Sequence, residues 1–193
     1  MTRKEQKEER RKAILMTALT LFVEKGYYDT RITDIAEAVP MSTGLMFHYF
    51  KSKEELLLEV VKMGAEGTKS LRKGITPDMM AQVQPDQYLV GFLRKMLSYA
   101  KDEPWVFHMF VLMGQARRTG MPEESRQVAL SVDIVDDTAG LVAKGQKDGI
   151  FHGGDAKLMS RCFWASVQGI MEEMAMDKDM KAPNPEWIVG LLR

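Results

Sequence analysis

The sequence predicts an all-α protein in two parts, a small N-terminal group of three helices followed by a larger helical region. Apolar residues recur at helical spacing over nearly the whole chain, whereas the alternation typical of strands is hard to find. Glycine and proline fall between these periodic segments rather than inside them, so they mark the ends of helices.

Composition narrows the class of protein. The chain has 193 residues, of which 45% are hydrophobic and 28% charged, as in ordinary globular proteins. Basic and acidic residues number 27 each, so no overall charge favours nucleic acid or a membrane. The single cysteine, Cys162, excludes an intramolecular disulfide and a multi-cysteine metal site. No apolar run approaches the about 18 residues of a membrane span, so we expect a cytoplasmic protein with no membrane contact.

The N-terminal helices are defined by their ends. A first helix is expected from about residue 4 to 25, with Gly26 ending it. Thr33 is expected to cap a short second helix, which Pro40 ends because the residue before a proline avoids the α region. Ser42 is expected to cap a very short third helix. Ser52, with a glutamate three residues on, predicts a fourth helix to about residue 73.

The rest of the chain also reads as helical. The stretch 74–86 is expected to be a linker or one extra turn. Helices are then expected at 86–101, 104–118, 122–148, 155–177 and 185–192, separated by glycine and proline. Asp155 and Asn184 are suited to cap the last two, and Pro185 suits a first helical position.

The spacing of the first helices favours a DNA-binding unit. Two short helices around a turn of about three residues, after one longer helix and before another, form the pattern of a helix-turn-helix. Such a unit lays its second short helix in the major groove. We therefore expect a DNA-binding domain at residues 1–52 and a helical domain at 53–193. The segment 1–12 adds six basic against three acidic residues, which alone would favour a solvated helix face.

The segment ITDIAEAVPMSTGLMFHYFKSKEELLLEVV resembles the DNA-binding segment of TetR-family transcriptional regulators. The segment KGQKDGIFHGGDAKLMSRCFWASVQGI is similar, more weakly, to the run into that family's penultimate helix. Two positions depart from the family pattern, Pro40 for a usual glycine and Phe47 for a usual tyrosine. Proline fixes φ near −65°, so we expect a turn without a left-handed residue there. The matching positions are Ile35, Ala36, Ser42, Gly44, Phe50, Lys53 and Leu56.

The resemblance and the chemistry of the side chains together assign DNA-contacting roles. Thr43 and Gly44 are expected to meet base edges at the start of the recognition helix, and His48 follows one turn later, with a solvent-exposed histidine as the alternative. Phe47 is expected to pack against sugar. Phosphate contacts through hydroxyl, backbone N–H or ammonium groups are expected from the remaining four, Thr33, Ser42, Tyr49 and Lys53.

The larger domain is expected to bind an effector and to form a homodimer. Its helices have apolar faces that favour a pocket for a small lipophilic or aromatic ligand, with ordinary core packing as the alternative. The expected pocket residues are Phe92, Met96, Trp105, His108, Met109, Met113, Trp164 and Gln168. The expected dimer residues, by family analogy, are Met159, Phe163, Val167, Ile170, Met171, Met174, Ile188 and Leu192.

These patterns predict a ligand-responsive transcriptional regulator, a repressor that binds a palindromic operator as a homodimer and needs no cofactor or metal. An enzyme is not expected, because no histidine or cysteine is spaced for a nucleophile with its base and no metal motif occurs. The alternative is a helical ligand-binding and dimerisation module with lost or weak DNA binding. Pro40, Phe47 and the neutral charge favour that alternative.

Overall fold

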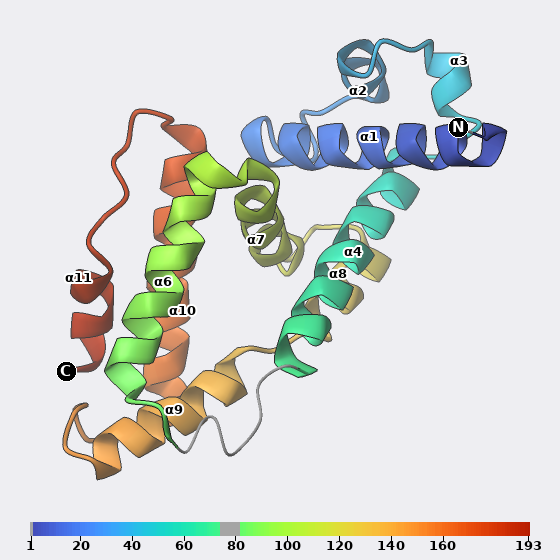
Figure 1. Cartoon of the computed structure of the whole chain (residues 1–193). Helices are drawn as coiled ribbons and strands as arrows, with labels where there is room; N and C mark the ends of the chain where they lie inside the picture. Colours follow the sequence, from blue (N-terminus) through green and yellow to red (C-terminus); the bar gives the residue numbers. More distant parts are fainter. Residues whose placement is uncertain (1, 74–81) are drawn as a thin grey trace. The chain divides into compact units, whose positions relative to one another are not determined.

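The computed structural model describes residues 2–73 and 82–193, and within these ranges the chain forms helices and no strand (Figure 1). The predicted all-α class is therefore confirmed. The linker or extra turn expected at 74–86 falls mainly on residues 74–81, which lie outside the described ranges. Within the same ranges, no helix combines the length and the apolar character needed to cross a bilayer.

The chain divides into two compact units. Unit 1 comprises residues 1–67 and 108–131, and unit 2 comprises residues 68–107 and 132–193. The division expected from the sequence, at 52/53, does not coincide with these units. Most of the fourth helix and a later segment of the chain pack with the N-terminal helices, and periodicity within a segment carries no signal for such long-range packing.

Unit 1 is built on α1 (Arg3–Glu24), α2 (Ile32–Ala38), α3 (Thr43–Met46) and most of α4 (Lys53–Lys73). It also contains the later part of α7 (Pro104–Ala116) and all of α8 (Glu123–Leu130). The apolar stripe of α1 forms its core, as predicted: Ile14, Ala18 and Phe22 are each 0% exposed. Gly26 follows α1 with φ of +88°, the left-handed conformation that ends helices and favours glycine.

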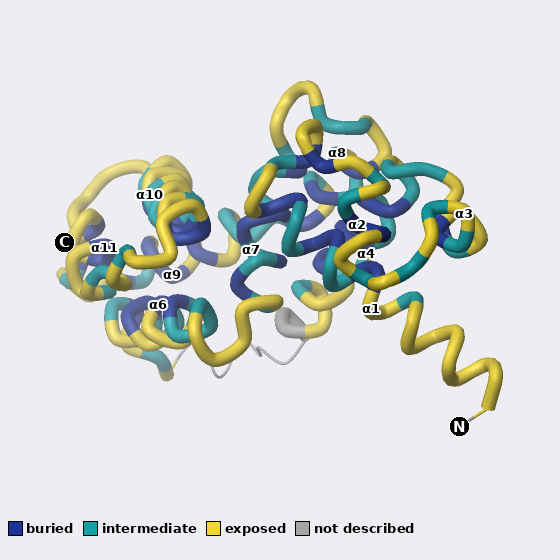
Figure 2. The backbone as a smooth tube through the Cα atoms, turned by 90° about the horizontal axis from the view of Figure 1, so that it is seen from above, coloured by how far each residue is buried: buried dark blue, intermediate teal, exposed yellow. Residues whose placement is uncertain are grey.

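Unit 2 contains α6 (Pro85–Asp102), α9 (Val135–Lys147), α10 (Ala156–Met176), α11 (Pro185–Val189) and the 3-10 turn η1 (Gly190–Leu192). α9 packs mainly against α10, and α11 packs against α6 and α10. The buried side of α10 lies on this core, as the burial colours in Figure 2 show. The predicted caps are confirmed, since Asp155 accepts from Lys157 N at 2.9 Å and Asn184 from Glu186 N at 3.1 Å.

The single helix expected at 122–148 is wrong, because the chain forms α8 and α9 with a break at residues 131–134. Ser131 turns back to donate its hydroxyl to Val128 O at 2.7 Å, and Asp133 Oδ1 accepts from Val135 N at 2.8 Å. Serine and aspartate both compete with the helix for backbone groups in this way. Ser131 and Asp133 were therefore the signal for this break in the sequence. The apolar residues around them made the segment look like one continuous helix.

Candidate nucleic-acid interface

The turn between α2 and α3 carries strain at Pro40. Met41 N donates to Ala36 O at 2.9 Å, which is the longer bond of the Schellman motif that commonly ends helices. That motif places Pro40 at the left-handed position, and its φ is +22°. The expectation that no left-handed residue would sit there is wrong. The pyrrolidine ring favours φ near −65° and lacks an N–H, so this turn is strained and loses the motif's shorter bond.

α3 is a single turn whose first residues are open to solvent. Ser42 Oγ accepts from Leu45 N at 3.2 Å, so the predicted cap is confirmed. The helix nevertheless ends at Met46, and His48 N donates to Leu45 O at 3.1 Å in a tighter turn beyond it. A Cβ added to Gly44 would meet no atom within 4 Å, so the backbone there can be approached closely.

The exposed and buried residues of this segment alternate in a way that suits an interface. Met46 and Phe50 are buried in unit 1, at 0% and 1% exposure, and hold the segment in place. The residues before and between them are exposed or half-buried, and Phe47 is 50% exposed despite being apolar. Of the predicted DNA-contacting residues, Ser42, Gly44, Phe47 and His48 are exposed, and Thr43 and Tyr49 are half-buried.

Thr33 is exposed on α2 but does not cap it, so that expectation is wrong. The cap position belongs to Arg31, whose backbone N–H donates to Asp34 Oδ2 at 3.1 Å. This bond is the main reason that the pKa of Asp34 lies below its usual value, with Lys25 at 3.5 Å adding to it. The aspartate at the third helical position was the signal that marks this start.

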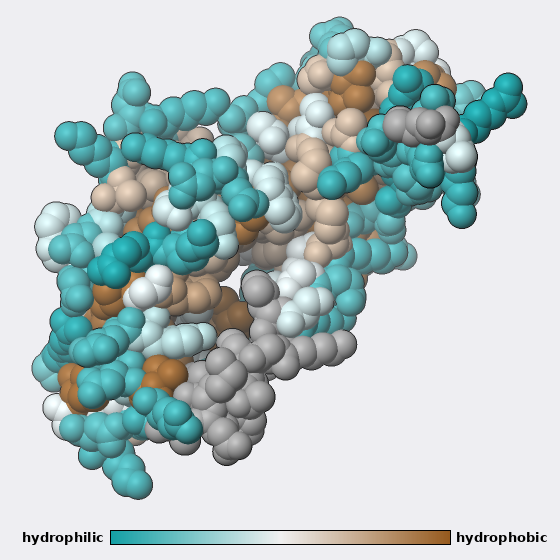
Figure 3. All heavy atoms as spheres, in the orientation of Figure 1, coloured by the Kyte–Doolittle hydropathy of each residue, from teal (hydrophilic) through white to brown (hydrophobic). Residues whose placement is uncertain are grey.

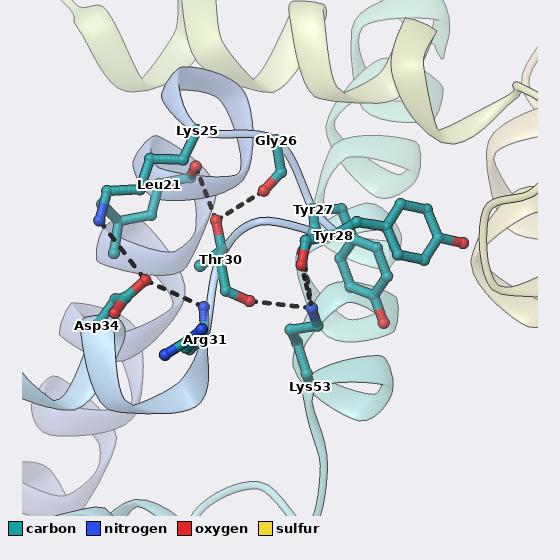
Figure 4. Close-up of polar contacts among 9 residues, drawn as sticks. All are labelled: Leu21, Lys25, Gly26, Tyr27, Tyr28, Thr30, Arg31, Asp34 and Lys53. Atoms are coloured by element: carbon teal, nitrogen blue, oxygen red, sulfur yellow. Dashed lines mark hydrogen bonds and ion pairs between the residues drawn. The ribbon is translucent and has the colours of Figure 1, made fainter.

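Lys53, the first residue of α4, binds the loop between α1 and α2 (Figure 4). Its ammonium group donates to Tyr27 O at 2.8 Å, Thr30 O at 2.9 Å and Tyr28 O at 3.4 Å. It also lies 4.4 Å from the centre of the Tyr27 ring. A lysine has three donors, so in this structure all three are used within the protein. We call this group, residues 27–30 with Lys53, the loop clasp. The predicted phosphate contact of Lys53 competes with it.

Two tyrosines of the loop clasp extend it, and sequence patterns did not single them out. Tyr27 OH donates to Glu54 Oε1 at 3.2 Å, and burial together with that carboxylate raises the pKa of Tyr27. The pKa of Glu54 is lowered, first by its own backbone N–H and then by Ser52. Tyr28 OH donates to the carbonyl of Gly120, which is 92 residues away in sequence. The clasp therefore links the α1–α2 loop to α4 and to the segment before α8.

α1 and α4 are joined by an ion pair. Arg11 Nη2 lies 2.5 Å from Glu59 Oε2, and its guanidinium lies 5.1 Å from the centre of the Phe50 ring. Partial burial tends to raise the pKa of Glu59, but hydrogen bonds from Lys62 and Arg11 outweigh it and lower that pKa. This pair connects the two helices through side chains that are partly exposed.

The predicted effector residues fall in both units. In unit 2, Phe92 and Trp164 pack edge to face with ring centres 5.8 Å apart, and Trp164 Nε1 donates to Thr138 Oγ1 at 2.9 Å. Gln168 donates to Glu172 at 2.9 Å, Met96 is half-buried and Trp105 is 48% exposed.

In unit 1, Met109 is buried and His108 and Met113 are half-buried. The sulfurs of Met109 and Met113 approach α4 at Gly64, where an added Cβ would lie 2.7 Å from each. Only a residue without a side chain fits this contact between α4 and α7 as it stands.

Most of the predicted dimer residues lie in the core of the protomer instead. Six of the eight are buried there, namely Phe163, Val167, Met171, Met174, Ile188 and Leu192, and Met159 and Ile170 are half-buried. These residues thus lie mainly on the buried side of α10, a helix that carries apolar residues on two opposite faces. Its exposed face comprises Leu158, Cys162, Ala165, Gly169 and Met176, with Trp187 and Leu191 exposed on the two short helical segments that follow.

Helices α1, α2 and α4 pack together and hold α3, a short helix that follows a tight turn and faces solvent. This arrangement defines a helix-turn-helix protein. Residues 14–60 match the family model "Bacterial regulatory proteins, tetR family". Residues 14–60 therefore carry the DNA-binding segment of the TetR family, and the relatives that the chain matches are transcriptional regulators rather than enzymes.

Individual relatives agree with this. HbdR of Aromatoleum is 46% identical over 55 residues, which are 28% of this chain and 24% of HbdR. RutR of Escherichia coli K12 is 26% identical over 162 residues, which are 82% of this chain and 72% of RutR. The structure of AibR with isovaleryl coenzyme A and operator DNA is similar in fold, with a TM-score of 0.68, 20% identity and coverage of 95% of this chain and 97% of AibR. This chain thus spans about a quarter of HbdR and most of RutR.

Proposed function

We propose that the protein is a ligand-responsive repressor that binds a palindromic operator as a homodimer in the cytoplasm. One observation carries the DNA-binding part of this proposal. The segment from Ser42 to Tyr49 presents small and polar groups and the ring of Phe47 to solvent while Met46 and Phe50 anchor it. A rigid, exposed helical turn of this kind fits the major groove, where Thr43, Gly44 and His48 would meet base edges.

DNA binding is tested by fluorescence anisotropy with duplexes that the protein selects from a random pool, measured at several salt concentrations. We expect specific binding with a steep negative salt slope. His48→Ala should weaken the selected sequence by about 1–3 kcal/mol if the side chain meets a base, and should relax selection at that position. Absence of binding at low salt would favour the alternative, a module that has lost DNA affinity, which the strained Pro40 and the missing hydroxyl at Phe47 support.

The exposed face of α10 supports the dimer. Leu158, Cys162, Ala165, Gly169 and Met176 follow one another at intervals of three, four or seven residues, so they form one stripe opposite the buried face, interrupted between Gly169 and Met176 by Glu172. An apolar stripe on a helix that already buries its other face marks an interaction surface. Small residues at its centre allow a second helix to approach closely. A two-fold dimer would place two recognition helices about 34–36 Å apart, one turn of DNA.

Sedimentation velocity tests the dimer with two matched variants. Ala165→Glu puts a charge at the centre of the stripe and should shift the protein toward monomer. Ala143→Glu makes the same change at an exposed alanine of α9 in the same unit and should leave the dimer intact. Equal sedimentation of both variants would refute this interface.

A lipophilic or aromatic effector is proposed to contact the half-buried Phe92 and Trp164 in unit 2. The contact at Gly64 then offers a route by which movement of α7 shifts α4. A ligand shifts such an equilibrium only by binding one arrangement more tightly, and a fiftyfold preference corresponds to about 2.3 kcal/mol. Thermal-shift measurements with lipophilic and aromatic compounds should give hits that Phe92→Ala reduces. A compound that stabilises the protein yet leaves operator affinity unchanged would argue against the coupling.

A further inference from the structure

The break at residues 131–134 lies where the chain passes from one unit to the other. The boundary falls between Ser131 and Val132, so α8 belongs to unit 1 with the helices of the candidate interface, and α9 belongs to unit 2 with Phe92 and Trp164. The chain also passes between the units inside α4 and inside α7, where the helix continues across the boundary. At the break the backbone is not helical, and a few residues at the end of an element are the usual place for a hinge.

On the unit 2 side of the break, side chains of α10 hold the first turn of α9. Ser160, which is 0% exposed, donates its hydroxyl to Val135 O at 2.8 Å. Lys157 Nζ lies 2.6 Å from Asp136 Oδ1, but both side chains are more than half exposed, so this ion pair adds little. The buried bond from Ser160 is therefore the stronger of these two, and it ties the start of α9 to α10.

A further tie runs through Thr138, which also lies at the start of α9. Thr138 is 5% exposed, and its hydroxyl accepts from Trp164 Nε1 at 2.9 Å and donates to Ile134 O at 2.9 Å. Its backbone N–H donates to the same oxygen at 3.2 Å, as a first helical bond. The bond from the indole strengthens the bond to Ile134, because hydrogen bonds in a chain polarise one another. Ile134 is the last residue of the break, so these two side-chain bonds, which we call the threonine relay, connect the ring of Trp164 to the break.

The other end of the threonine relay is an aromatic cluster that reaches the surface. The ring of Trp164 packs edge to face on Phe92 and on Phe163, with ring centres 5.8 and 5.3 Å apart. Phe163 is buried, whereas Phe92 and Trp164 are half-buried. Over unit 2, hydrophobic residues reach the surface among hydrophilic ones in the space-filling view (Figure 3). An indole is rigid, so a molecule that displaces the open part of the Trp164 ring also displaces its N–H.

We infer that Thr138 is a positioning residue that links the proposed effector residues Phe92 and Trp164 to the break between α8 and α9. This inference rests on the proposed function and supplies a route for its regulation in addition to the contact at Gly64. A ligand that displaces the indole weakens its bond to the Thr138 hydroxyl, and the break then loses the tie that joins Ile134 to α10. Because α8 lies beyond the break in unit 1, the change reaches the helices proposed to bind DNA along the chain.

Two substitutions at Thr138 test the threonine relay without a ligand. Thr138→Val keeps the shape of the side chain and removes the hydroxyl, whereas Thr138→Ser keeps the hydroxyl. The probe is a duplex of about 30 base pairs that the wild-type protein selects from a random pool, titrated by fluorescence anisotropy. Cutting the relay imitates displacement of the indole, so Thr138→Val should bind this duplex more weakly. The expected loss is about fivefold for each relay that is cut, the factor that corresponds to the net loss of one hydrogen bond. Thr138→Ser should bind as the wild type does.

Hydrogen exchange reports on the break itself. Exchange of the peptide that covers residues 131–138 should be about fivefold faster in Thr138→Val than in the wild type, and unchanged in Thr138→Ser. Trp164→Phe is a second way to cut the relay, because it removes the indole N–H and keeps an aromatic ring beside Phe92. This variant should change operator affinity and exchange in the same direction as Thr138→Val. Circular dichroism shows whether each variant is folded.

An operator affinity of Thr138→Val that equals or exceeds that of Thr138→Ser would overturn this inference and leave the proposed function standing. This holds even if exchange at the break differs, because the relay would then act on local stability alone. If Thr138→Val does not fold, wild-type affinity in Trp164→Phe would overturn the inference instead. Failure of the wild-type protein to bind any duplex at low salt would overturn the proposed function, and this inference with it.

Discussion

Replacing Lys53 by methionine tests whether the loop clasp stabilises the fold. The substitution keeps the length of the side chain and removes the ammonium group, which makes two short bonds, at 2.8 and 2.9 Å, to backbone carbonyls. Bonds to a charged donor contribute about 1.5–3 kcal/mol each when they are buried, and the partial exposure of this site reduces each to about 1 kcal/mol. Together with the cation–π contact to Tyr27, we expect a loss of about 2–3 kcal/mol.

The assay is thermal unfolding followed by circular dichroism, with Lys51→Met as the matched control two residues away on an exposed side chain. For a chain of this size, the expected loss for Lys53→Met is a fall in Tm of about 5–10 °C. The control should change Tm by no more than about 1–2 °C, as surface substitutions do. If both variants unfold at the same temperature, the clasp does not stabilise the protein. A Lys53→Met variant with unchanged Tm and weakened DNA binding would favour the phosphate contact.

Three further substitutions test strain, packing and charge. Pro40→Gly should raise the free energy of unfolding by about 1–2 kcal/mol, because glycine accepts the positive φ and restores an N–H. If chemical denaturation gives a lower free energy of unfolding for the variant than for the wild type, the turn is not strained at Pro40. Gly64→Ala should be less stable than Gly67→Ala by about 1–3 kcal/mol, because only the former meets two sulfurs, and equal midpoints would refute this. The pKa of Glu59 is lower in the folded protein than its usual value of 4.5, so the ionised carboxylate stabilises the fold above pH 4.5. This stabilisation is lost as the pH falls below that value and the carboxylate takes up a proton. In the Glu59→Gln variant, Tm should therefore decrease less on acidification than in the wild type, by a difference that corresponds to about 0.5–1 kcal/mol in the free energy of unfolding. If Tm decreases as steeply as in the wild type, the Arg11–Glu59 pair is not the cause of the acid sensitivity.

The helices and most of their ends could be predicted because the determining interactions are local. Ser42, Asp155 and Asn184 each accept from a backbone N–H two or three residues away, and such bonds follow directly from sequence spacing. The start of α2 was missed for a related reason. Thr33 has the commoner capping side chain, whereas the observed start depends on Asp34 receiving a bond from the backbone of Arg31.

The exposed side of α10 could not be distinguished from the buried side in the sequence, because both sides carry apolar residues. Phe163 and Val167 look like contacts for a partner until the structure shows them buried in the protomer, and the smaller Ala165 and Gly169 look ordinary until they are found in solvent. The loop clasp was missed because its bonds run from one side chain to backbone carbonyls, for which any residue type would serve.

The bond from Tyr28 to Gly120 has a genetic consequence. Its acceptor is a main-chain oxygen, held in place by a residue with φ of +96°, a conformation that side chains disfavour. A replacement at position 120 would therefore loosen the α1–α2 loop even though the site lies far along the chain from every residue proposed to face the operator. If the protein represses as proposed, a screen for mutants that fail to repress should return this position among its hits, and footprinting would find no nucleotide that it protects.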